Sequence, residues 1–334
     1  MRFSHLLTFF LSLWLASGAP IPVRSLPSDN GLSQIVSQYT GPTTNSPVSP
    51  TWLPNFSTGI TPIPCHSHND YVQKVPLYQG LEAGCISTEA DIHLRKGDLF
   101  VAHGGNEIKW ANTLSSLYLD PLIAILEAQN QNTAVGEAPK GIWDESPETS
   151  LVLYLDFKSK GTNVFNTVRD QLEDLRQKGY LTFWTPETGL VQRPLTVVGT
   201  GATDFKDVVA NATYRDIFFD IDARSNKLAG DSVQFDTTNS YSVSTPMGAA
   251  IGKPGLQFDE NQKAKITTLV QQANALGLKT RYWDAPGKGD LKKRNAVWRN
   301  LLDLGVTLLN VGDLIDIRDW FKKRDAQGEI VDEQ

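Results

Sequence analysis

Eight short runs rich in β-branched and aromatic residues, separated by helical segments, constrain the fold of this chain more than any other feature. Strands are expected at 61–68, 85–92, 150–158, 195–201, 216–222, 241–246, 278–284 and 306–313. Apolar residues recur with helical spacing over 163–179 and 260–277, and each of these stretches ends in a glycine. Strands that alternate with helices form a parallel sheet.

The length of this pattern favours a closed barrel over an open sheet. The roughly 275 residues from Ile60 onward are close to the ~250 that are typical of a (β/α)₈ barrel. An open, doubly wound sheet usually carries a glycine fingerprint after its first strand, and none follows here. We therefore expect the α/β class, with a single (β/α)₈ TIM barrel.

The first 58 residues differ from the rest in composition. Residues 1–18 read as a secretory signal peptide, with Arg2 ahead of a short apolar run and small residues at its end. Residues 19–58 form a Ser/Thr/Pro-rich lead-in, and 59–334 form the barrel. The expected location is therefore extracellular, either free or associated with the cell wall.

Charge and cysteine content exclude some partners. The net charge is −6 and no run of Lys and Arg could follow a phosphate backbone, so we expect no nucleic-acid partner. No stretch after the leader approaches the ~20 apolar residues of a transmembrane helix.

Cys65 and Cys85 permit one disulfide, which the sequence alone does not assign. Asn55 and Asn211 lie in N-glycosylation acceptor patterns, and nothing in the sequence indicates an oligomeric state.

The second and third expected strands send acidic side chains toward the barrel interior. Alternate residues of a strand face opposite sides, so Glu89 and Asp91 of "CISTEADI" share one face. Asp156 and Lys158 of "SLVLYLDFK" likewise lie opposite an apolar stripe. Buried carboxylates repel one another and lose solvation, and a bound cation is the simplest compensation. The oxygen-rich, sulfur-free set favours one Mg²⁺ or Ca²⁺ over zinc.

Histidines are expected close to these carboxylates. The first strand ends in "CHSHNDY", which places His66 and His68 on one face at its carboxyl end, where barrel enzymes keep their chemistry. His103 follows a tight turn at "RKGD" and would return over the barrel mouth. These histidines would be free for proton transfer or for attack on phosphorus.

Other interpretations of these residues remain open. Glu89 and Asp91 alone could be solvated or salt-bridged, and "HSH" could be the metal motif of amidohydrolase barrels, although later strands lack the histidines such sites need. His93 is expected at an exposed strand end, and His66 as a support for His68. Secondary candidates, each with a structural alternative, are Asp220, Asp222 and Trp283.

The order of His68, Glu89-x-Asp91 and His103 resembles the phospholipase-C-like phosphodiesterase superfamily, which includes glycerophosphodiester phosphodiesterases and sphingomyelinase D type phospholipases. The closest resemblance is to the fungal altered-inheritance-of-mitochondria protein 6 family, on the motifs "HSHNDY", "EADI", "RYWD" and "GVTLLN". The resemblance implies catalytic roles for His68 and His103, a ligand role for Asn69, and a place for Lys158 near the phosphate. The H-R-G and P-E-N-T signatures of glycerophosphodiester phosphodiesterases are absent.

These observations predict a secreted, metal-dependent phosphoric diester hydrolase. Glu89, Asp91 and Asp156, with Asn69, would hold one divalent cation, and the substrate would be a glycerophosphodiester or a (lyso)phospholipid. One histidine would activate the attacking oxygen or attack phosphorus itself, and the other would protonate the leaving alcohol. The alternative is a non-catalytic barrel that binds a phospholipid headgroup or a cell-wall component.

Overall fold

The computed structural model describes residues 31–43, 50–134, 136–230 and 233–327. The predicted signal peptide lies outside these residues. Within them, no helix has both the length and the apolar character that crossing a bilayer requires. The strands are β1 (Ile63–Ser67), β2 (Cys85–Arg95), β3 (Asp98–Val101), β4 (Leu151–Phe157), β5 (Phe183–Thr185), β6 (Gly189–Val191), β7 (Leu195–Gly201), β8 (Ile217–Asp222), β9 (Ser240–Pro246), β10 (Lys279–Trp283) and β11 (Leu308–Val311).

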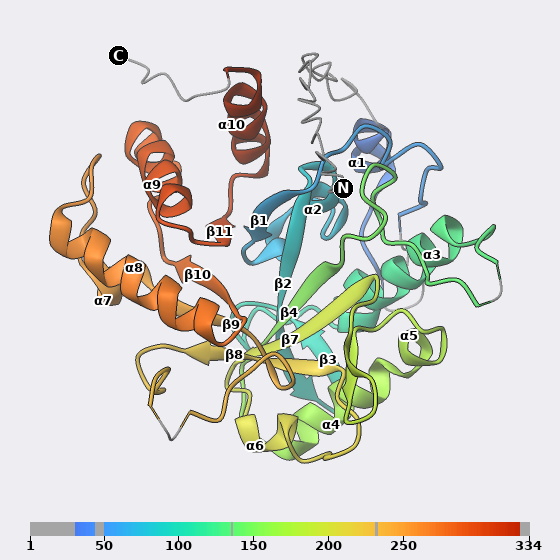
Figure 1. The fold of residues 1–334 in the computed structure, drawn as a ribbon. Coiled ribbons are helices and arrows are strands. Elements are labelled where there is room, and N and C mark those ends of the chain that lie inside the picture. Colours follow the sequence, from blue (N-terminus) through green and yellow to red (C-terminus); the bar gives the residue numbers. More distant parts are fainter. Residues whose placement is uncertain (1–30, 44–49, 135, 231–232, 328–334) are drawn as a thin grey trace, which may run out of the picture.

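Helices follow most of these strands and surround them (Figure 1). The α-helices are α1 (Leu32–Gln38), α2 (Tyr78–Glu82), α3 (Asp120–Gln129), α4 (Thr162–Gln171), α5 (Glu173–Gln177), α6 (Phe205–Val208), α7 (Met247–Ile251), α8 (Glu260–Ala275), α9 (Leu291–Asp303) and α10 (Leu314–Gln327). A 3₁₀ turn, η1 (Asp70–Val72), and a π-helical turn, η2 (Ser115–Leu119), complete the described elements.

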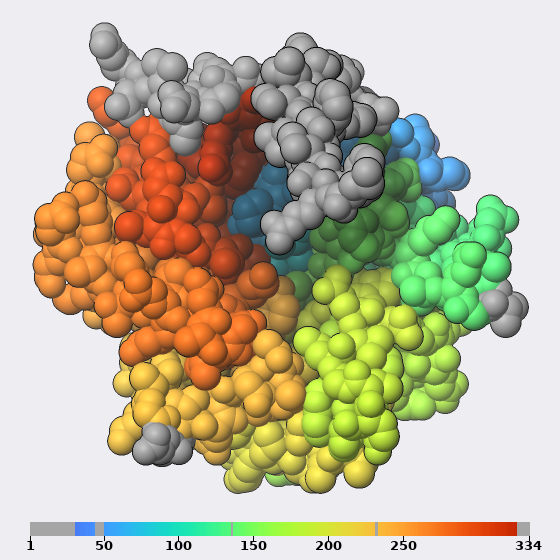
Figure 2. Space-filling view, in the orientation of Figure 1, coloured from blue at the N-terminus to red at the C-terminus, as the bar shows by residue number. Residues whose placement is uncertain are grey.

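The main sheet closes on itself. Its order is β1-β11-β10-β9-β8-β7-β4-β2-β3, and β1 also pairs with β2. Every pairing in this sheet is parallel except that of β3, which forms an antiparallel hairpin with β2. Eight parallel strands therefore form a (β/α)₈ TIM barrel, as the sequence predicts, and the chain follows the ring in sequence order (Figure 2).

The expected helices form where the apolar spacing places them. Helix α8 begins with a capping box between Asp259 and Gln262, and Gly277 after it adopts a left-handed φ of 73°. The stretch predicted as one helix over 163–179 is instead two, α4 and α5, interrupted at Leu172. Gly179 ends the second helix with a φ of 70°.

Apolar side chains of the strands pack outward against the helices. The stripe predicted on β4 is buried in the larger core cluster, which includes Leu151, Leu153, Leu155 and Phe157. Part of the Ser/Thr/Pro-rich lead-in joins this core, since Ile35 of α1 and Phe56 are buried in it. The barrel interior is different: Tyr154 is buried there and donates its hydroxyl hydrogen to Ser242 Oγ at 2.7 Å.

A disulfide links the first two barrel strands. Cys65 of β1 and Cys85 of β2 are bonded, with their Cα atoms 4.7 Å apart. The bridge closes the segment that carries His68, Asn69 and Tyr71 at the carboxyl end of β1. The pairing that the sequence left open is thus made between neighbouring strands.

Candidate functional site

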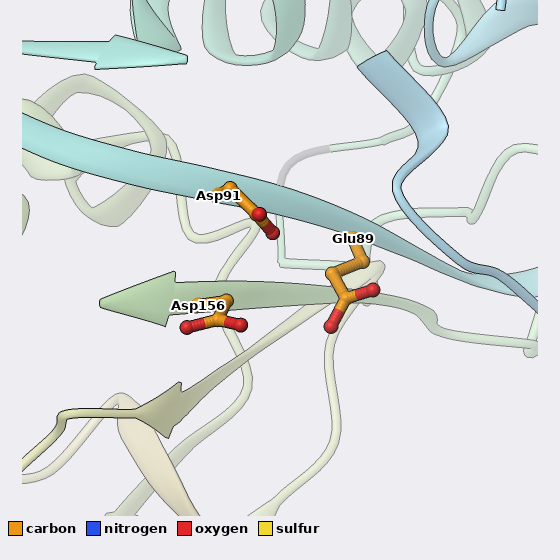
Figure 3. A group of neighbouring side chains, drawn as sticks. All are labelled: Glu89, Asp91 and Asp156. Atoms are coloured by element: carbon orange, nitrogen blue, oxygen red, sulfur yellow. The ribbon is translucent and has the colours of Figure 1, made fainter. Parts of the chain in front are cut away.

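Three carboxylates converge at the carboxyl ends of two neighbouring barrel strands. Glu89 and Asp91 lie along β2, and Asp156 lies on β4 (Figure 3). The parallel register pairs Asp91 with Asp156, so alternation along both strands brings the two side chains together. One oxygen from each of the three residues lies within 4.8 Å of the others. Carboxylate oxygens at this spacing are suited to a hard divalent cation.

Asp91 is unevenly compensated. Its Oδ2 lies 2.7 Å from Lys158 Nζ, accepts a hydrogen bond from the Tyr71 hydroxyl at 2.8 Å, and lies 3.2 Å from His103 Nδ1. Its Oδ1 is buried and accepts no hydrogen bond from any described residue. A buried, ionised oxygen without a partner is costly, and a cation shared with Glu89 and Asp156 would supply one. The residues present therefore fit a divalent cation.

Asp156 is held beside Lys158 and a glycine. Lys158 Nζ donates to Asp156 Oδ2 at 2.7 Å. Burial raises the pKa of Asp156 to about 6, and repulsion from Asp91 and Glu89 raises it further. Lys158 lowers this pKa and offsets part of the rise. Gly201, with a φ of 65°, leaves room for this carboxylate, because a Cβ there would lie 1.9 Å from Asp156 Oδ1.

Lys158 remains charged in this setting. Burial lowers its pKa, but the hydrogen bonds to Asp156 and Asp91 outweigh burial, and the net pKa is raised. One ammonium group therefore bridges two of the three carboxylates. The third carboxylate, that of Glu89, has other partners.

Glu89 contacts two histidines, His66 of β1 and His68 directly after it, and also approaches Arg281. Its Oε2 accepts the backbone N–H of Asn69 at 3.1 Å and lies 3.5 Å from the Nε2 atoms of both His66 and His68. Burial raises the pKa of Glu89, but these histidines and Arg281 outweigh burial and hold the pKa well below its usual range. Glu89 is therefore ionised.

His66 is a neutral, buried histidine. Burial and the charge of Arg281 lower its pKa to about 4. Its Nε2 lies 3.1 Å from Arg281 Nη1 and 3.5 Å from Glu89 Oε2. On the other side of the ring, Nδ1 lies 2.7 Å from Ser87 Oγ. This arrangement fits the supporting role predicted for His66 rather than proton transfer.

His68 and His103 flank the carboxylates from two sides. His68 is half-buried with its Nε2 toward Glu89, and His103 is exposed with its Nδ1 toward Asp91. His103 returns over the mouth after the β2–β3 hairpin, as the turn at "RKGD" predicts. Beside His68, a cavity of about 150 Å³ opens between the loops that follow β10 and β11.

Asn69 reaches the site through its backbone. It follows the end of β1 in a left-handed conformation, with a φ of 50°, and this turn directs its N–H to Glu89. Asn tolerates this conformation better than most residues. Its side chain as a metal ligand stays a prediction.

Comparisons with known proteins place this chain among phosphodiesterase-like proteins. The model of the AIM6-like phosphodiesterase domain matches residues 54–220, which contain β1, β2, β4 and all three carboxylates. The chain belongs to the AIM6-like phosphodiesterase family. It is 32% identical to an altered inheritance of mitochondria protein 6 homolog from Arthroderma benhamiae over 315 residues, which is 92% of this chain and 99% of that relative.

Two further AIM6 relatives are similar over less of their length. Altered inheritance of mitochondria protein 6 from Lachancea thermotolerans is 34% identical over 75% of this chain and 64% of the relative. The Saccharomyces cerevisiae protein of the same name is 32% identical over 78% of this chain and 72% of that relative. A solved structure from Agrobacterium tumefaciens, named as a glycerophosphoryl diester phosphodiesterase, has a TM-score of 0.39 at 14% identity, over 79% of this chain and 100% of that one. The fold of this AIM6-like chain rests on its own strand order.

The secondary candidates lie apart from the carboxylates in this AIM6-like barrel. Asp220 Oδ1 accepts hydrogen bonds from Ser242 and Ser244, each at 2.6 Å. Asp222, at the end of β8, pairs with Arg224 at 2.7 Å. The Arg224 guanidinium also lies 5.7 Å from the ring centroid of half-buried Trp283. Asp222 thus has a local partner, and Asp220 belongs to a polar cluster in the interior.

Arg281 organises that cluster, and the sequence analysis did not single it out. Its Nη2 donates to Asp220 Oδ2 at 3.1 Å, its Nη1 donates to Asn310 Oδ1 at 3.0 Å, and it lies 3.6 Å from Glu89 Oε1. The signal was present, because a strand that alternates between buried Thr280 and Tyr282 must point Arg281 into the barrel.

Tyr71 was also missed, and His93 was assigned wrongly. The Tyr71 hydroxyl contacts Asp91 and lies 3.4 Å from His103 Nδ1, so it connects the loop after β1 to the loop after β3. His93, expected to be exposed, is buried, with its Nε2 3.0 Å from the Ala102 carbonyl oxygen. The hairpin strand β3 returns the chain over this residue.

Proposed function

We propose that this protein is a metal-dependent phosphodiesterase that cleaves a glycerophosphodiester or a (lyso)phospholipid. One arrangement carries the proposal: three convergent carboxylates, one with an orphaned oxygen, lie between two histidines at the carboxyl end of a barrel. Membership of a phosphodiesterase-like family supports the reaction class.

Glu89, Asp91 and Asp156 would hold one Mg²⁺ or Ca²⁺, with Asn69 as a candidate fourth ligand, and the bound cation would neutralise charge on the phosphate. Lys158, which bridges Asp91 and Asp156, would add a second positive charge within reach of the phosphate oxygens.

The two histidines have their nitrogens arranged for proton transfer in opposite directions. Glu89 faces Nε2 of His68, which leaves Nδ1 for the substrate. Asp91 faces Nδ1 of His103, which leaves Nε2. One histidine accepts the proton of the attacking hydroxyl as the new P–O bond forms, and the other protonates the alcohol as the old P–O bond breaks. If the attacking hydroxyl belongs to the substrate, the first product is a cyclic phosphodiester.

We also propose secretion, in line with the leader sequence. Cys65 and Cys85 form a disulfide, which an oxidising compartment would maintain, and both candidate glycosylation residues, Asn55 and Asn211, are exposed. Immunoblots of the medium and of cell-wall extracts from an expressing fungal host test this proposal. Retention of the full-length chain inside the cell would contradict it.

Phosphorus NMR tests the proposed reaction. The purified chain is incubated with glycerophosphodiesters, lysophospholipids, sphingomyelin and phosphatidylinositol, in Mg²⁺, in Ca²⁺ and in chelator. The expected result is a new phosphorus signal for one substrate class, lost in chelator and lost with His68→Ala. Binding of the cation without any new signal across the panel would instead favour a barrel that only binds its ligand.

A further inference from the structure

The exposed apolar side chains of this protein gather at one end of the barrel. Among the described residues, the large apolar side chains that stand exposed are Val72, Trp110, Leu190, Leu256, Leu291 and Ile315. Four of these six lie at the mouth. Val72 follows β1, Leu291 follows β10 and Ile315 follows β11, each after the carboxyl end of a barrel strand. Trp110 packs on Phe100 of β3, which pairs with the part of β2 that extends past Asp91. Val72, Trp110, Leu291 and Ile315 are 68%, 51%, 51% and 62% exposed, respectively. The end of the barrel that carries the site is therefore also its apolar end.

Side-chain contacts join these segments into one continuous rim. Tyr71 lies 3.4 Å from His103, which connects the loop of Val72 to the loop of Trp110. Gln73 Nε2 donates to the Gly312 carbonyl oxygen at 3.4 Å, which connects the loop after β1 to the loop after β11. Lys288 pairs with Asp313 at 2.9 Å and adds the loop after β10. We call the surface formed by residues 71–74, 104–110, 287–293 and 312–315 the rim.

Lysines accompany the apolar side chains of the rim. Lys74, Lys109 and Lys292 lie within two residues of Val72, Trp110 and Leu291, respectively. All three are exposed and form no ion pair with another described residue.

Most carboxylates of the same rim are already engaged. Asp313 pairs with Lys288 and Arg294, and Asp290 caps α9 by accepting the Lys293 N–H. Of the remaining acidic groups in these loops, Glu107 accepts the Gly104 N–H at a long 3.4 Å. In a chain of net charge −6, the rim thus offers unpaired positive charge beside its apolar side chains.

We propose that the rim docks on the surface of an anionic phospholipid bilayer. Separate apolar side chains interleaved with lysines suit the headgroup boundary, because the apolar groups insert while the ammonium groups meet lipid phosphates. A protein partner would instead be expected to need a contiguous apolar core at the interface. Delivery of a lipid phosphodiester to His68 and His103 rests on the proposed function, whereas the docking itself does not.

Co-sedimentation with vesicles tests the docking. Chain purified from the medium of a secreting host is mixed with vesicles of phosphatidylcholine alone or with phosphatidylserine added. Binding is expected only with the anionic lipid at low salt. The triple variant Val72→Ser/Trp110→Ser/Leu291→Ser should weaken partitioning by at least about tenfold. Lys109→Gln/Lys292→Gln should weaken it by about fivefold per lysine.

Matched controls come from elsewhere on the surface. Leu190, 46% exposed, lies in the β5–β6 hairpin that leads into β7, and therefore at the opposite end of the barrel. Leu190→Ser should leave partitioning unchanged, as should Lys265→Gln on the exposed face of α8. Equal losses from Leu190→Ser and from the triple variant would overturn the proposal, as would equal binding to neutral and anionic vesicles.

Two further measurements distinguish membrane docking from the proposed phosphodiesterase activity and from dimerisation. Hydrolysis of a water-soluble glycerophosphodiester should be unchanged in the rim variants, so a chain that binds vesicles but hydrolyses nothing contradicts the proposed function alone. Light scattering distinguishes a membrane from a second copy of the chain. If the rim variants abolish a dimer and the parent chain does not bind anionic vesicles, the proposal is wrong.

Discussion

Asp220 and Asp91 are both buried carboxylates of barrel strands, but they are compensated in opposite ways. Asp220 has partners on both oxygens, with two serines on Oδ1 and Thr200 and Arg281 on Oδ2. Asp91 gathers its partners on Oδ2 and leaves Oδ1 with none among the described residues. We call the groups around Asp220 and Arg281 the inner cluster, and those around Asp91, Asp156 and Lys158 the mouth cluster.

The difference separates structure from chemistry. A fully satisfied polar network fixes one arrangement of the interior, whereas an under-satisfied one keeps a place for a ligand. Glu89 belongs to both clusters, since it faces Arg281 on one side and His68 on the other. Changes in the inner cluster should therefore affect stability, and changes in the mouth cluster should affect metal binding and turnover.

The largest expected effect is on turnover, from the histidines at the mouth. His68→Ala and His103→Ala should each lower kcat by about 10²- to 10⁴-fold, because each removes a proton-transfer group. The thermal midpoint should change little, since neither side chain is buried. His93→Gln, whose amide can still donate to Ala102, is the control and should retain near-parental turnover. If the two alanine variants failed to fold, the mouth would serve stability as the inner cluster does, and the distinction between the two clusters would be wrong.

Removal of Arg281 should have the largest effect on folding. Arg281→Met leaves Asp220 and Glu89 buried without their shared cation, and we expect a loss of about 3–5 kcal/mol in the free energy of unfolding. Urea unfolding followed by circular dichroism measures this loss. Arg224→Met, at an exposed pair, is the control and should change stability little. Similar losses from both variants would show that the inner cluster has no special role.

Metal addition should stabilise the mouth cluster. A cation present at a hundredfold excess over its Kd should add about 2.7 kcal/mol of stability and raise Tm by about 5–10 °C. Differential scanning fluorimetry in chelator, Mg²⁺ and Ca²⁺ measures the shift. Asp91→Asn should remove it and Asp222→Asn should retain it. A shift that survives Asp91→Asn would place the cation elsewhere.

The smallest expected effect concerns Lys158. When no metal is bound, its ammonium group offsets the negative charges of Asp91 and Asp156. Lys158→Met should cost about 1–2 kcal/mol in chelator, a value reduced from that of a fully buried pair because the ammonium is partly exposed. Added cation should recover most of this loss. Lys178→Met, at an exposed pair with Glu127, should show no cation dependence. A loss independent of cation would argue that lysine and metal do not share the same carboxylates.

Sequence reasoning reached the parts of this structure that depend on local periodicity. The alternation of strands and helices predicted the barrel, and period-two alternation predicted that Glu89, Asp91 and Asp156 share the interior, where the register then pairs Asp91 with Asp156. The return of His103 toward Asp91 was predicted from the turn "RKGD" that precedes β3.

The remaining features depend on contacts between separate elements. Arg281 meets Glu89 and Asp220 across long separations in the chain, so no local pattern could name its partners. His93 was predicted to be exposed because it lies at the end of an expected strand. In the structure, β3 pairs with that end of β2 and buries His93. Tyr71 lay outside any periodic element, and only the packing of two loops places its hydroxyl on Asp91.

The bond between Cys65 and Cys85 makes the segment from β1 to β2 a covalent ring. Its two ends are 20 residues apart in sequence, and cross-linking a loop of this size removes about 3 kcal/mol of chain entropy from the unfolded state. His68, Asn69 and Tyr71 all lie inside the ring, so they stay tethered near β2 even when the barrel opens locally. A chain made under reducing conditions would carry these residues on an open loop, so recombinant production in a reducing cytosol should give a less stable protein with a less ordered first loop.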